Sequence, residues 1–388
     1  MAVKEFNDSQ SGCVVQLVDY SNYNTFNEQT GKDRLNTDII SGKTPDIYDL
    51  GYWSENQLAE KGLLENLKPY FDSDADFPYS SLVPSARRVL ENRGGLYQCV
   101  PFFSVITTAV DKSVAQNEFT FAQLRELVGQ NSLRKVFGPE MTRNLLLAYV
   151  LCFMADEFYS TEDMSCNFDS ETFVTVLDWM SKLPETQEQF EGNDTLPLGS
   201  AYVGELMVLI SESGLDIPVD ISTADTVFSG AAQYLGFPSE SGGGFALVPG
   251  ISLGMSSSSQ NKDAVWTFFR FLLNRTNVSG DGLSLVQEYL EQCLDRRIIW
   301  ISENVHGCVV MSPQGFVNVP LQSFGQDEIK DRIMEIVGKI NCTAQYDQDI
   351  YKIIYELSQP MFSGNMSPEA TAAQIQSRVS IYLAEQYG

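Results

Sequence analysis

The alternation of strand-like and helix-like segments in the first 70 residues constrains this fold more than any other feature. Residues Ala2–Asp8 read as the end of a helix, and CVVQLVDY (13–20) predicts a strand because it is rich in β-branched residues. Segment 31–44 has apolar residues at helical spacing, PDIYDL (45–50) is a short strand opened by proline, and 55–70 predicts another helix. Strands that alternate with helices pair in parallel, so the sequence predicts an α/β fold.

The rest of the chain keeps this mixed character. The apolar stretch 96–111, broken by Pro101, predicts a strand, and LLLAYVLCF (145–153) predicts a helix buried all round. Segment 170–183 predicts an amphipathic helix capped by its first serine, and 195–214 suggests strand, turn and helix. At 388 residues the chain is too long for one ordinary core, so two domains are expected.

The charge balance excludes several classes of partner. The chain has 25 Lys and Arg against 51 Asp and Glu, a formal net charge of −26. Such a surface repels phosphate backbones and anionic lipid, so we expect neither nucleic-acid binding nor docking on a membrane surface. No apolar run is long enough to span a bilayer, and the first residues lack the basic and apolar regions of a signal peptide.

Metal, phosphate and redox motifs are weak or incomplete, so we predict no metal and no cofactor. Asp72, Asp74 and Asp76 copy the first ligands of an EF-hand loop, but Phe77 replaces its glycine and Val83 its glutamate. A looser Ca²⁺ contact at these aspartates is left open. SGGGF (241–245) lacks the G-K-[ST] of a P-loop and indicates a hinge or a hairpin turn. The seven cysteines contain no C-x-x-C pair, and one disulfide is left open.

The segment GISLG (250–254) satisfies the G-x-S-x-G pattern of a hydrolase nucleophile, which would make Ser252 catalytic. That motif requires a helix directly after the serine, and here SSSSQNKD intervenes. The chain has one histidine, His306, so every histidine-dependent mechanism rests on it. We therefore favour a strand with close-packed glycines over a nucleophile, and expect Asn261 to cap the helix that follows.

Aromatic residues recur at the ends of the predicted elements. In an open α/β sheet the carboxyl ends of the strands are where ligands bind. Aromatic faces beside polar groups suit sugar rings, whose C–H faces are apolar and whose rims carry hydroxyl groups. Taken singly, most of these aromatic side chains would only pack in the core or at its rim. The aromatic residues at the element ends are Tyr20, Tyr23, Tyr52, Trp53, Phe102, Phe103 and Tyr202.

Four stretches, taken in order, resemble the family 1 extracellular solute-binding proteins of ABC importers, the maltose-binding-protein-like group. They are LNTDIISGKTPDIYDL followed by LAEKGLLENLKPYF, GLYQCVPFFSVITTAVDKSV, GFALVPGISLGMSSSSQNKDAVWTFFRFLL, and the tail AAQIQSRVSIYLAEQYG. The resemblance covers nearly the whole chain. It implies a periplasmic-binding-protein-like α/β fold of two lobes, with a hinge of crossing segments and a ligand cleft between the lobes.

On this resemblance, lobe one comprises 1–104 plus 245–280, and lobe two comprises 108–240 plus 283–388. The implied function is capture of a solute, expected to be a carbohydrate or oligosaccharide, by hinge closure and without chemistry. The protein would not be an enzyme, and it would be a monomer that hands its solute to an ABC permease.

The resemblance also implies ligand-contacting positions, with Trp53 and Tyr202 as the first choices. Ser252 lies on the return strand and would contribute a hydrogen bond. The remaining positions end a strand, line the first crossing, or face that crossing from lobe two. They are Tyr20, Asn22, Tyr52, Phe102, Phe103, Ser104 and Ser200.

One departure from the family concerns the start of the chain. Family members begin with a strand before the helix that ends in AVKEFN, whereas here that helix follows Met1 at once. We therefore expect the export signal, the lipid-attached cysteine and this first strand to be missing from the chain. The resemblance implies an extracytoplasmic protein, in the periplasm or held at the cell surface through a lipid anchor.

Three alternatives stay open. The first is an α/β hydrolase that uses Ser252 with His306 and an unassigned aspartate. The second is a solute sensor that reports to a receptor rather than to a permease. The third is a binding protein for polyamines, which the acidic composition makes chemically reasonable although no acidic cluster lies at the expected site.

Overall fold

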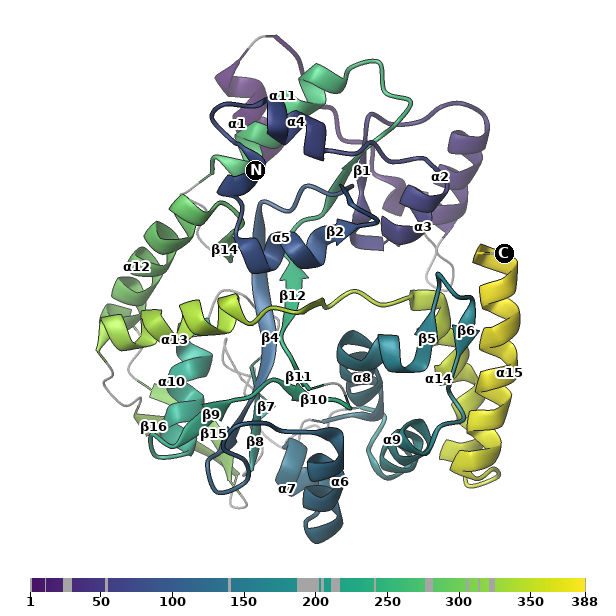
Figure 1. Cartoon of the computed structure of the whole chain (residues 1–388), viewed down its shortest axis with the longest axis vertical. Helices are drawn as coiled ribbons and strands as arrows, with labels where there is room; N and C mark the ends of the chain where they lie inside the picture. Colours follow the sequence, from purple (N-terminus) through teal and green to yellow (C-terminus); the bar gives the residue numbers. More distant parts are fainter. Residues whose placement is uncertain are drawn as a thin grey trace. The chain divides into compact units, whose positions relative to one another are not determined.

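The computed structural model describes most of the chain and divides it into two compact units (Figure 1). Unit 1 comprises Met1–Phe103 and Pro249–Cys293, and unit 2 comprises Ser104–Val248 and Leu294–Gly388. The described residues are 2–10, 12–23, 30–52, 55–138, 141–186, 202–203, 206–210, 217–240, 242–275, 282–304, 307–312, 315–320 and 325–387.

The unit boundaries differ from the lobe boundaries expected above at the third crossing. Residues 283–293 belong to unit 1 rather than to the second body. The reason is backbone pairing, because Leu283 lies opposite Phe103 in an antiparallel ladder and the Leu285 amide donates to the Pro101 carbonyl. Residues 245–248, expected in lobe one, belong to unit 2.

Unit 1 is built from short elements. Its helices are α1 (Ala2–Ser9), α2 (Thr30–Ile40), α3 (Glu55–Glu60), α4 (Lys68–Ser73), α5 (Pro84–Leu90) and α11 (Lys262–Leu273), with 3₁₀ turns at Tyr20–Tyr23, Leu50–Tyr52 and Tyr79–Ser81. Its strands are β1 (Ile47–Asp49), β2 (Glu91–Asn92), β3 (Gly95–Leu96), β13 (Leu253–Met255) and β14 (Leu283–Ser284). Strand β4 (Phe102–Asp111) and helix α12 (Gln287–Asn304) each run from one unit into the other.

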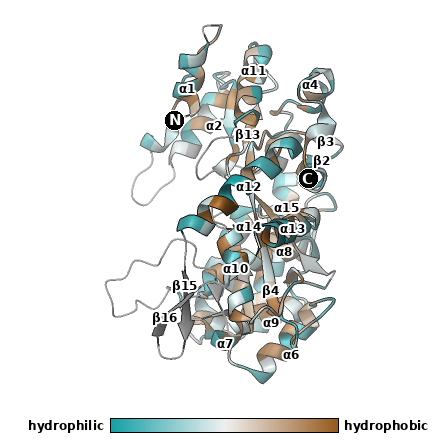
Figure 2. Cartoon of the chain, turned by 90° about the vertical axis from the view of Figure 1, so that its left-hand side faces the viewer, coloured by the Kyte–Doolittle hydropathy of each residue, from teal (hydrophilic) through white to brown (hydrophobic). Residues whose placement is uncertain are grey.

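The helix after the GISLG segment has the buried stripe that its sequence predicted. Val265, Phe268, Phe269 and Leu272 of α11 are buried, and Phe6 of α1 packs edge-on against Phe268 with ring centroids 5.0 Å apart. Figure 2 shows the matching pattern, with brown and teal residues alternating along α11. Amphipathic packing of this kind supplies most of the stability of a short helix.

Unit 2 is larger and holds the longest helices. They are α6 (Phe121–Gln130), α7 (Leu133–Phe137), α8 (Arg143–Phe158), α9 (Glu171–Lys182), α10 (Ile217–Val227), α13 (Gln326–Gly338), α14 (Gln348–Phe362) and α15 (Pro368–Tyr387). Its strands are β5 (Tyr159–Ser160), β6 (Ser165–Cys166), β7 (Tyr202–Val203), β8 (Met207–Ile210), β9 (Ala232–Tyr234), β10 (Phe237–Pro238), β11 (Gly243–Gly244), β12 (Ala246–Pro249), β15 (Gly307–Ser312), β16 (Gly315–Pro320) and β17 (Cys342–Thr343).

Strand β4 is the central strand of the main sheet. The strand order is β17–β12–β4–β8–β7, and β9 and β14 also pair with β4. All residues of β4 except the last are buried, which explains why its sequence is an unbroken apolar run rather than an alternating one. Strands β12 and β17 pair in parallel, whereas β8 and β9 pair antiparallel to β4, so the sheet is mixed.

Helices α8, α9, α14 and α15 surround the main core of unit 2. Nine residues of α8 are buried, which confirms the prediction from LLLAYVLCF. Ser170 caps α9 by accepting a hydrogen bond from the Phe173 amide, and this too confirms the expectation. The hairpin predicted for SGGGF is present, because Phe237 of β10 lies opposite Gly244 of β11.

Four sequence-based expectations are wrong. Residues 13–19 form no strand, since no described strand pairs with them, and Val14, Leu17 and Val18 are 66–76% exposed. The helix expected over 55–70 is split in two after Gly62, whose φ of +66° ends the first helix. Residues 207–210, expected to be helical, form strand β8. In addition, Asn261 stands at the start of α11 without capping it through its side chain.

Candidate functional site

The segment that follows β1 connects the sheet of unit 1 to helix α3. Strand β1 pairs with β13, and the Leu50 amide donates to the Ser252 carbonyl, so the end of β1 lies beside the return strand. Tyr52 lies in the 3₁₀ turn that follows, although its side chain is outside the described residues, as is Trp53. The backbone of Tyr52 therefore lies directly after the end of a strand.

Ser252 is held in a buried hydrogen bond. Its side chain is 4% exposed, and its Oγ donates to Oε1 of the equally buried Gln98 over 2.7 Å. An amide oxygen cannot take the proton of a nucleophile, and the next element is the strand β13 rather than a helix. His306 lies outside the described residues. Within the described part of the chain Ser252 has no activating base, and strand β13 confirms the strand that the sequence favoured over a nucleophile.

The predicted contacts on the first crossing lie inside the main sheet. Phe102, Phe103 and Ser104 are 6%, 0% and 7% exposed on β4. Gly282 lies very close to the backbone of Phe103. A Cβ added to Gly282 would lie 2.6 Å from the Phe103 carbonyl oxygen. Gly282 also has a φ of +93°, so this position requires glycine.

The other predicted contacts occupy separate surroundings. The Tyr20 hydroxyl donates to Oδ2 of Asp38 over 3.1 Å, which ties the 3₁₀ turn to α2. Asn22 is exposed, and its side-chain amide donates to the Asp19 carbonyl. Tyr202 pairs through its backbone with Leu209 in the β7–β8 ladder, whereas its side chain lies outside the described residues, as does Ser200.

Sequence reasoning missed an aromatic ladder on α14. The rings of Tyr346 and Tyr351 lie 5.7 Å apart, those of Tyr351 and Tyr355 6.3 Å apart with planes within 6°, and those of Tyr355 and Phe362 6.1 Å apart. Tyr351 and Tyr355 are half-buried, and burial raises the pKa of Tyr351. The i, i+4 spacing of Tyr351 and Tyr355 was a readable signal for one helix face.

This ladder begins where a parallel strand ends. Strand β17 stops at Thr343, and Asp347 caps α14 by accepting hydrogen bonds from the amides of Asp349 and Ile350. Tyr346 lies between the strand and the cap. Because β17 pairs in parallel with β12, the ladder stands at the kind of strand end where α/β sheets bind ligands.

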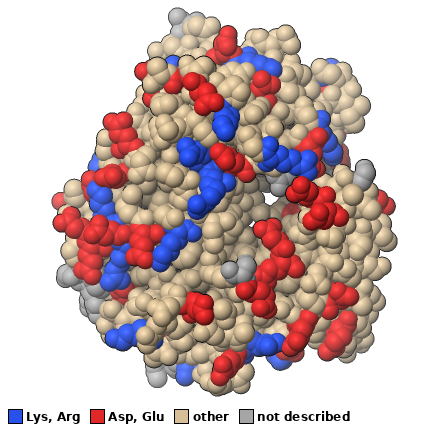
Figure 3. Space-filling model, viewed as in Figure 1, with Lys and Arg blue, Asp and Glu red and all other residues tan. Residues whose placement is uncertain are grey.

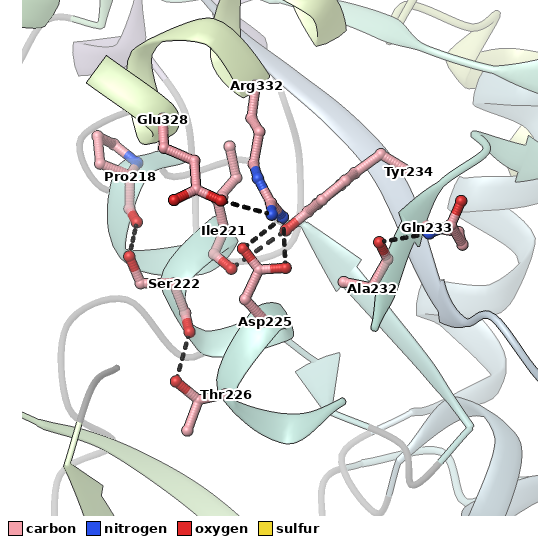
Figure 4. Close-up of polar contacts among 10 residues, drawn as sticks. All are labelled: Pro218, Ile221, Ser222, Asp225, Thr226, Ala232, Gln233, Tyr234, Glu328 and Arg332. Carbon is pink, nitrogen blue, oxygen red and sulfur yellow. Dashed lines mark hydrogen bonds and ion pairs between the residues drawn. The ribbon is translucent and has the colours of Figure 1, made fainter. Parts of the chain in front are cut away.

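A buried ionic network joins α10, α13 and β9 in the same unit (Figure 4). Both carboxylate oxygens of Asp225 lie 2.6 Å from Nη1 of Arg332, whose Nη2 contacts Glu328 at 3.2 Å. The Tyr234 hydroxyl donates to the Ile221 carbonyl over 3.1 Å. Burial raises the pKa of Asp225, and the neighbouring guanidinium partly offsets this shift. Asp225, Arg332, Glu328 and the Tyr234 hydroxyl each have a partner in the protein here, so we assign the network to packing rather than to ligand binding.

Two of the three aspartates that copy an EF-hand, Asp74 and Asp76, are paired with protein groups. Nε and Nη2 of Arg270 lie 2.9 Å from Asp74 and 2.5 Å from Asp76, and the Trp266 indole donates to Asp74 over 3.0 Å. A guanidinium therefore occupies the place of a cation. No group of three metal-ligating side chains occurs among the described residues.

Charged side chains of both signs lie together on part of the face in Figure 3, whereas its lower right-hand side carries mostly red, acidic side chains. Over the region of α12 and α13, blue and red side chains alternate in Figure 3, in keeping with the 2.8 Å ion pair between Lys330 and Asp295. The six cysteines whose side chains the structure describes are free thiols. Among the described residues, no helix is both long and apolar enough to cross a membrane.

Comparison with solved structures identifies the fold. A putative oligosaccharide periplasmic-binding protein from Synechococcus sp. MITs9220 matches with a TM-score of 0.56 and 14% identity, covering 100% of this chain and 95% of that one. An ABC substrate-binding protein from Listeria monocytogenes in complex with cycloalternan matches with a TM-score of 0.55 and 17% identity, covering 99% and 95%. The sugar-binding protein MalE from Xanthomonas citri matches with a TM-score of 0.53 and 15% identity, covering 92% and 88%.

The chain has the fold of the ABC-transporter solute-binding proteins. No family model matches the sequence, and no curated protein matches it. The solute-binding-protein fold extends over the whole chain, which confirms the fold class that the four sequence stretches implied. Its solved neighbours are substrate-binding proteins rather than enzymes.

Proposed function

We propose that this protein captures a solute outside the cytoplasm and delivers it to the permease of an ABC transporter. The observation that carries the proposal is the match of the solute-binding-protein fold over 99% of the chain and 95% of a substrate-binding protein. Binding in this proposal involves no covalent step. Ser252 fits this view, because its hydroxyl is engaged with a neutral amide.

The solute we propose is a carbohydrate. Neighbours of the same fold are described in complex with cycloalternan and with α-D-tagatose, the latter at a TM-score of 0.51. The half-buried tyrosine ladder of α14 offers the flat apolar surface on which the C–H face of a sugar ring stacks.

The proposed contacts come from both units, each taken by itself. In unit 1 they are Trp53 and Tyr52, with Tyr20 and Asn22 on the preceding turn, and Ser252. Phe102, Phe103 and Ser104 on β4 are almost wholly buried in the sheet, so we leave these three sequence-predicted positions out of the proposed contacts. In unit 2 the proposed contacts are Tyr202 and Ser200, to which we add Tyr351 and Tyr355 of the ladder. Trp53, Tyr202 and Tyr351 are the strongest choices, because an aromatic ring is the main apolar contact for a sugar.

Thermal-shift screening against mono- and oligosaccharides, with polyamines alongside, tests the proposal. A solute at 100 times its Kd adds about 2.7 kcal/mol of stability to the state that binds it. Isothermal titration then gives Kd for the wild type, Tyr351→Ala and a matched control, Tyr289→Ala. We expect Tyr351→Ala to weaken binding at least tenfold and the control to leave it unchanged. A panel in which only polyamines shift the transition would refute the choice of carbohydrate.

A further inference from the structure

The chain between α1 and the first 3₁₀ turn is extended without belonging to a sheet. Residues 13–19 contain no helix, turn or bend, and within the described part of the chain no strand pairs with them. Three of their apolar side chains lie in solvent, since Val14, Leu17 and Val18 are 76%, 75% and 66% exposed. Exposed apolar side chains on an extended backbone are the features of an unpaired edge strand.

Side chains from the preceding residues occupy one edge of this segment. The Val15 amide donates to Oδ1 of Asn7, and the Val15 carbonyl accepts from Nδ2 of Asn7, both over 2.9 Å. The Cys13 amide and carbonyl bond in the same way to the side-chain amide of Gln10. The two side-chain amides therefore take the place of a neighbouring strand along this edge and hold the segment extended.

The opposite edge of the segment is open. The backbone groups of successive residues in an extended chain point to opposite sides, so those of Val14, Gln16 and Val18 point away from Asn7. Among the residues that the structure describes, none accepts from or donates to the backbone of these three. A strand with one occupied and one open edge has room for a single further strand.

We propose that the open edge of 14–18 pairs with the same edge of a second copy of this chain. In an antiparallel ladder centred on Gln16, Val14 lies opposite the partner's Val18, and Gln16 lies opposite the partner's Gln16. Each of these pairs exchanges two backbone hydrogen bonds, so the ladder uses all the open groups of both copies. The dimer does not depend on which solute the protein binds.

Sequence pattern and charge favour a second copy as the occupant of this edge. The stretch VVQLV has the same order of apolar and polar residues in both directions, as a twofold interface between identical strands requires. The register puts Val15 opposite the partner's Leu17, which is an apolar pair. No charged residue occurs between Asp8 and Asp19, and Asp19 lies opposite the partner's Cys13. The two copies therefore meet at an uncharged stretch, and their aspartates do not oppose each other.

The geometry limits the assembly to a weak dimer. Asn7 and Gln10 occupy the other edge, so pairing ends at two copies. The ladder is short, whereas the interfaces of stable dimers bury at least about 1,200 Å². The net charge of −26 repels two copies at a distance, and salt screens this repulsion. We therefore expect dimers at high protein concentration, and more of them at about 0.15 M than at about 0.01 M salt.

Sedimentation velocity on the full chain, over a series of protein concentrations, tests the dimer. Gln16→Pro removes the central N–H of the ladder, which has no bond within the described part of the chain, so the monomer should keep its stability. Gln16→Ala is the matched control, because it loses the same side chain but keeps that N–H. We expect Gln16→Pro to raise the dissociation constant of the dimer at least about tenfold, and Gln16→Ala to change it by less than about threefold.

Hydrogen exchange by mass spectrometry locates the contact and keeps the test decisive if the proline variant folds poorly. In the wild type, the amides of 14–18 should gain protection as the protein concentration rises, whereas those of α6 should not change. A wild type that stays monomeric at every concentration would overturn the proposal and leave the edge to a strand from elsewhere. Growth beyond a dimer, equal weakening by Gln16→Pro and Gln16→Ala, or a dimer without added protection at 14–18 would overturn it as well.

Discussion

Removing the guanidinium of the buried ionic network should destabilise unit 2 strongly. Arg332 of α13 donates to both oxygens of Asp225, a residue of α10 that is 107 positions away in sequence and 1% exposed. Arg332→Met keeps the side-chain length but leaves the carboxylate buried without its cation. Breaking a buried pair in this way costs about 3–5 kcal/mol. Because the Arg332 side chain is 24% exposed, we expect the lower end, about 3 kcal/mol.

Urea unfolding followed by circular dichroism measures this loss, with two transitions fitted if the units unfold separately. Arg125→Met is the matched control, since its pair with Glu171 is exposed on both sides and should contribute about 1 kcal/mol or less. Adding Asp225→Asn to Arg332→Met should restore part of the stability, because the second change removes the orphaned charge.

The same pair makes a prediction about pH. Burial raises the pKa of Asp225, so the folded state holds this proton more tightly than the unfolded chain does. Without Arg332 that pKa rises further. The destabilisation of Arg332→Met should therefore be largest at neutral pH and shrink on acidification as Asp225 takes up its proton. Equal losses for Arg332→Met and Arg125→Met, or a loss that grows in acid, would refute the reasoning.

Other substitutions test the packing in both units. Gly243→Ala would place a Cβ 1.8 Å from a backbone carbonyl oxygen and should lower the free energy of unfolding in urea by about 3 kcal/mol. Gly129→Ala meets open space within α6 and should raise that free energy by about 0.5–1 kcal/mol. Equal effects of the two substitutions would contradict the packing. Leu17→Lys replaces a side chain that is 75% exposed, so light scattering should show less aggregation with unchanged stability; the opposite would indicate that Leu17 is buried in solution. Tyr382→Phe removes a hydroxyl that donates to the buried Asp347 carboxylate at 2.9 Å and should cost about 2 kcal/mol; a neutral result would show that the bond contributes nothing.

The elements with strong local signals followed from the sequence. The apolar run of α8, the serine cap of α9 and the stripe of α11 each depend on residues within one helix, so periodicity and capping chemistry are enough to predict them. The same holds for the start of β4 directly after Pro101. The order of such segments along the chain was also enough to predict the fold class.

The features that the sequence did not predict share a cause: each depends on a partner that is distant in the sequence. Residues 13–19 have strand-like composition, but a strand needs a neighbour to pair with, and no described strand provides one. The sequence already argued against a nucleophile at Ser252, but it could not show that Gln98, 154 residues earlier, accepts a hydrogen bond from the Ser252 hydroxyl. Nothing in the local sequence marks either relation.

The candidate site divides in the same way. The sequence by itself determined an acidic α/β protein, with aromatic residues following predicted strands at positions such as Trp53. Only the tertiary structure brought Tyr346 beside the helical pair of Tyr351 and Tyr355, and only it paired Arg332 with the buried Asp225. The physical reason is that spacing fixes the face of a helix, whereas burial and charge compensation are set by residues that folding brings near.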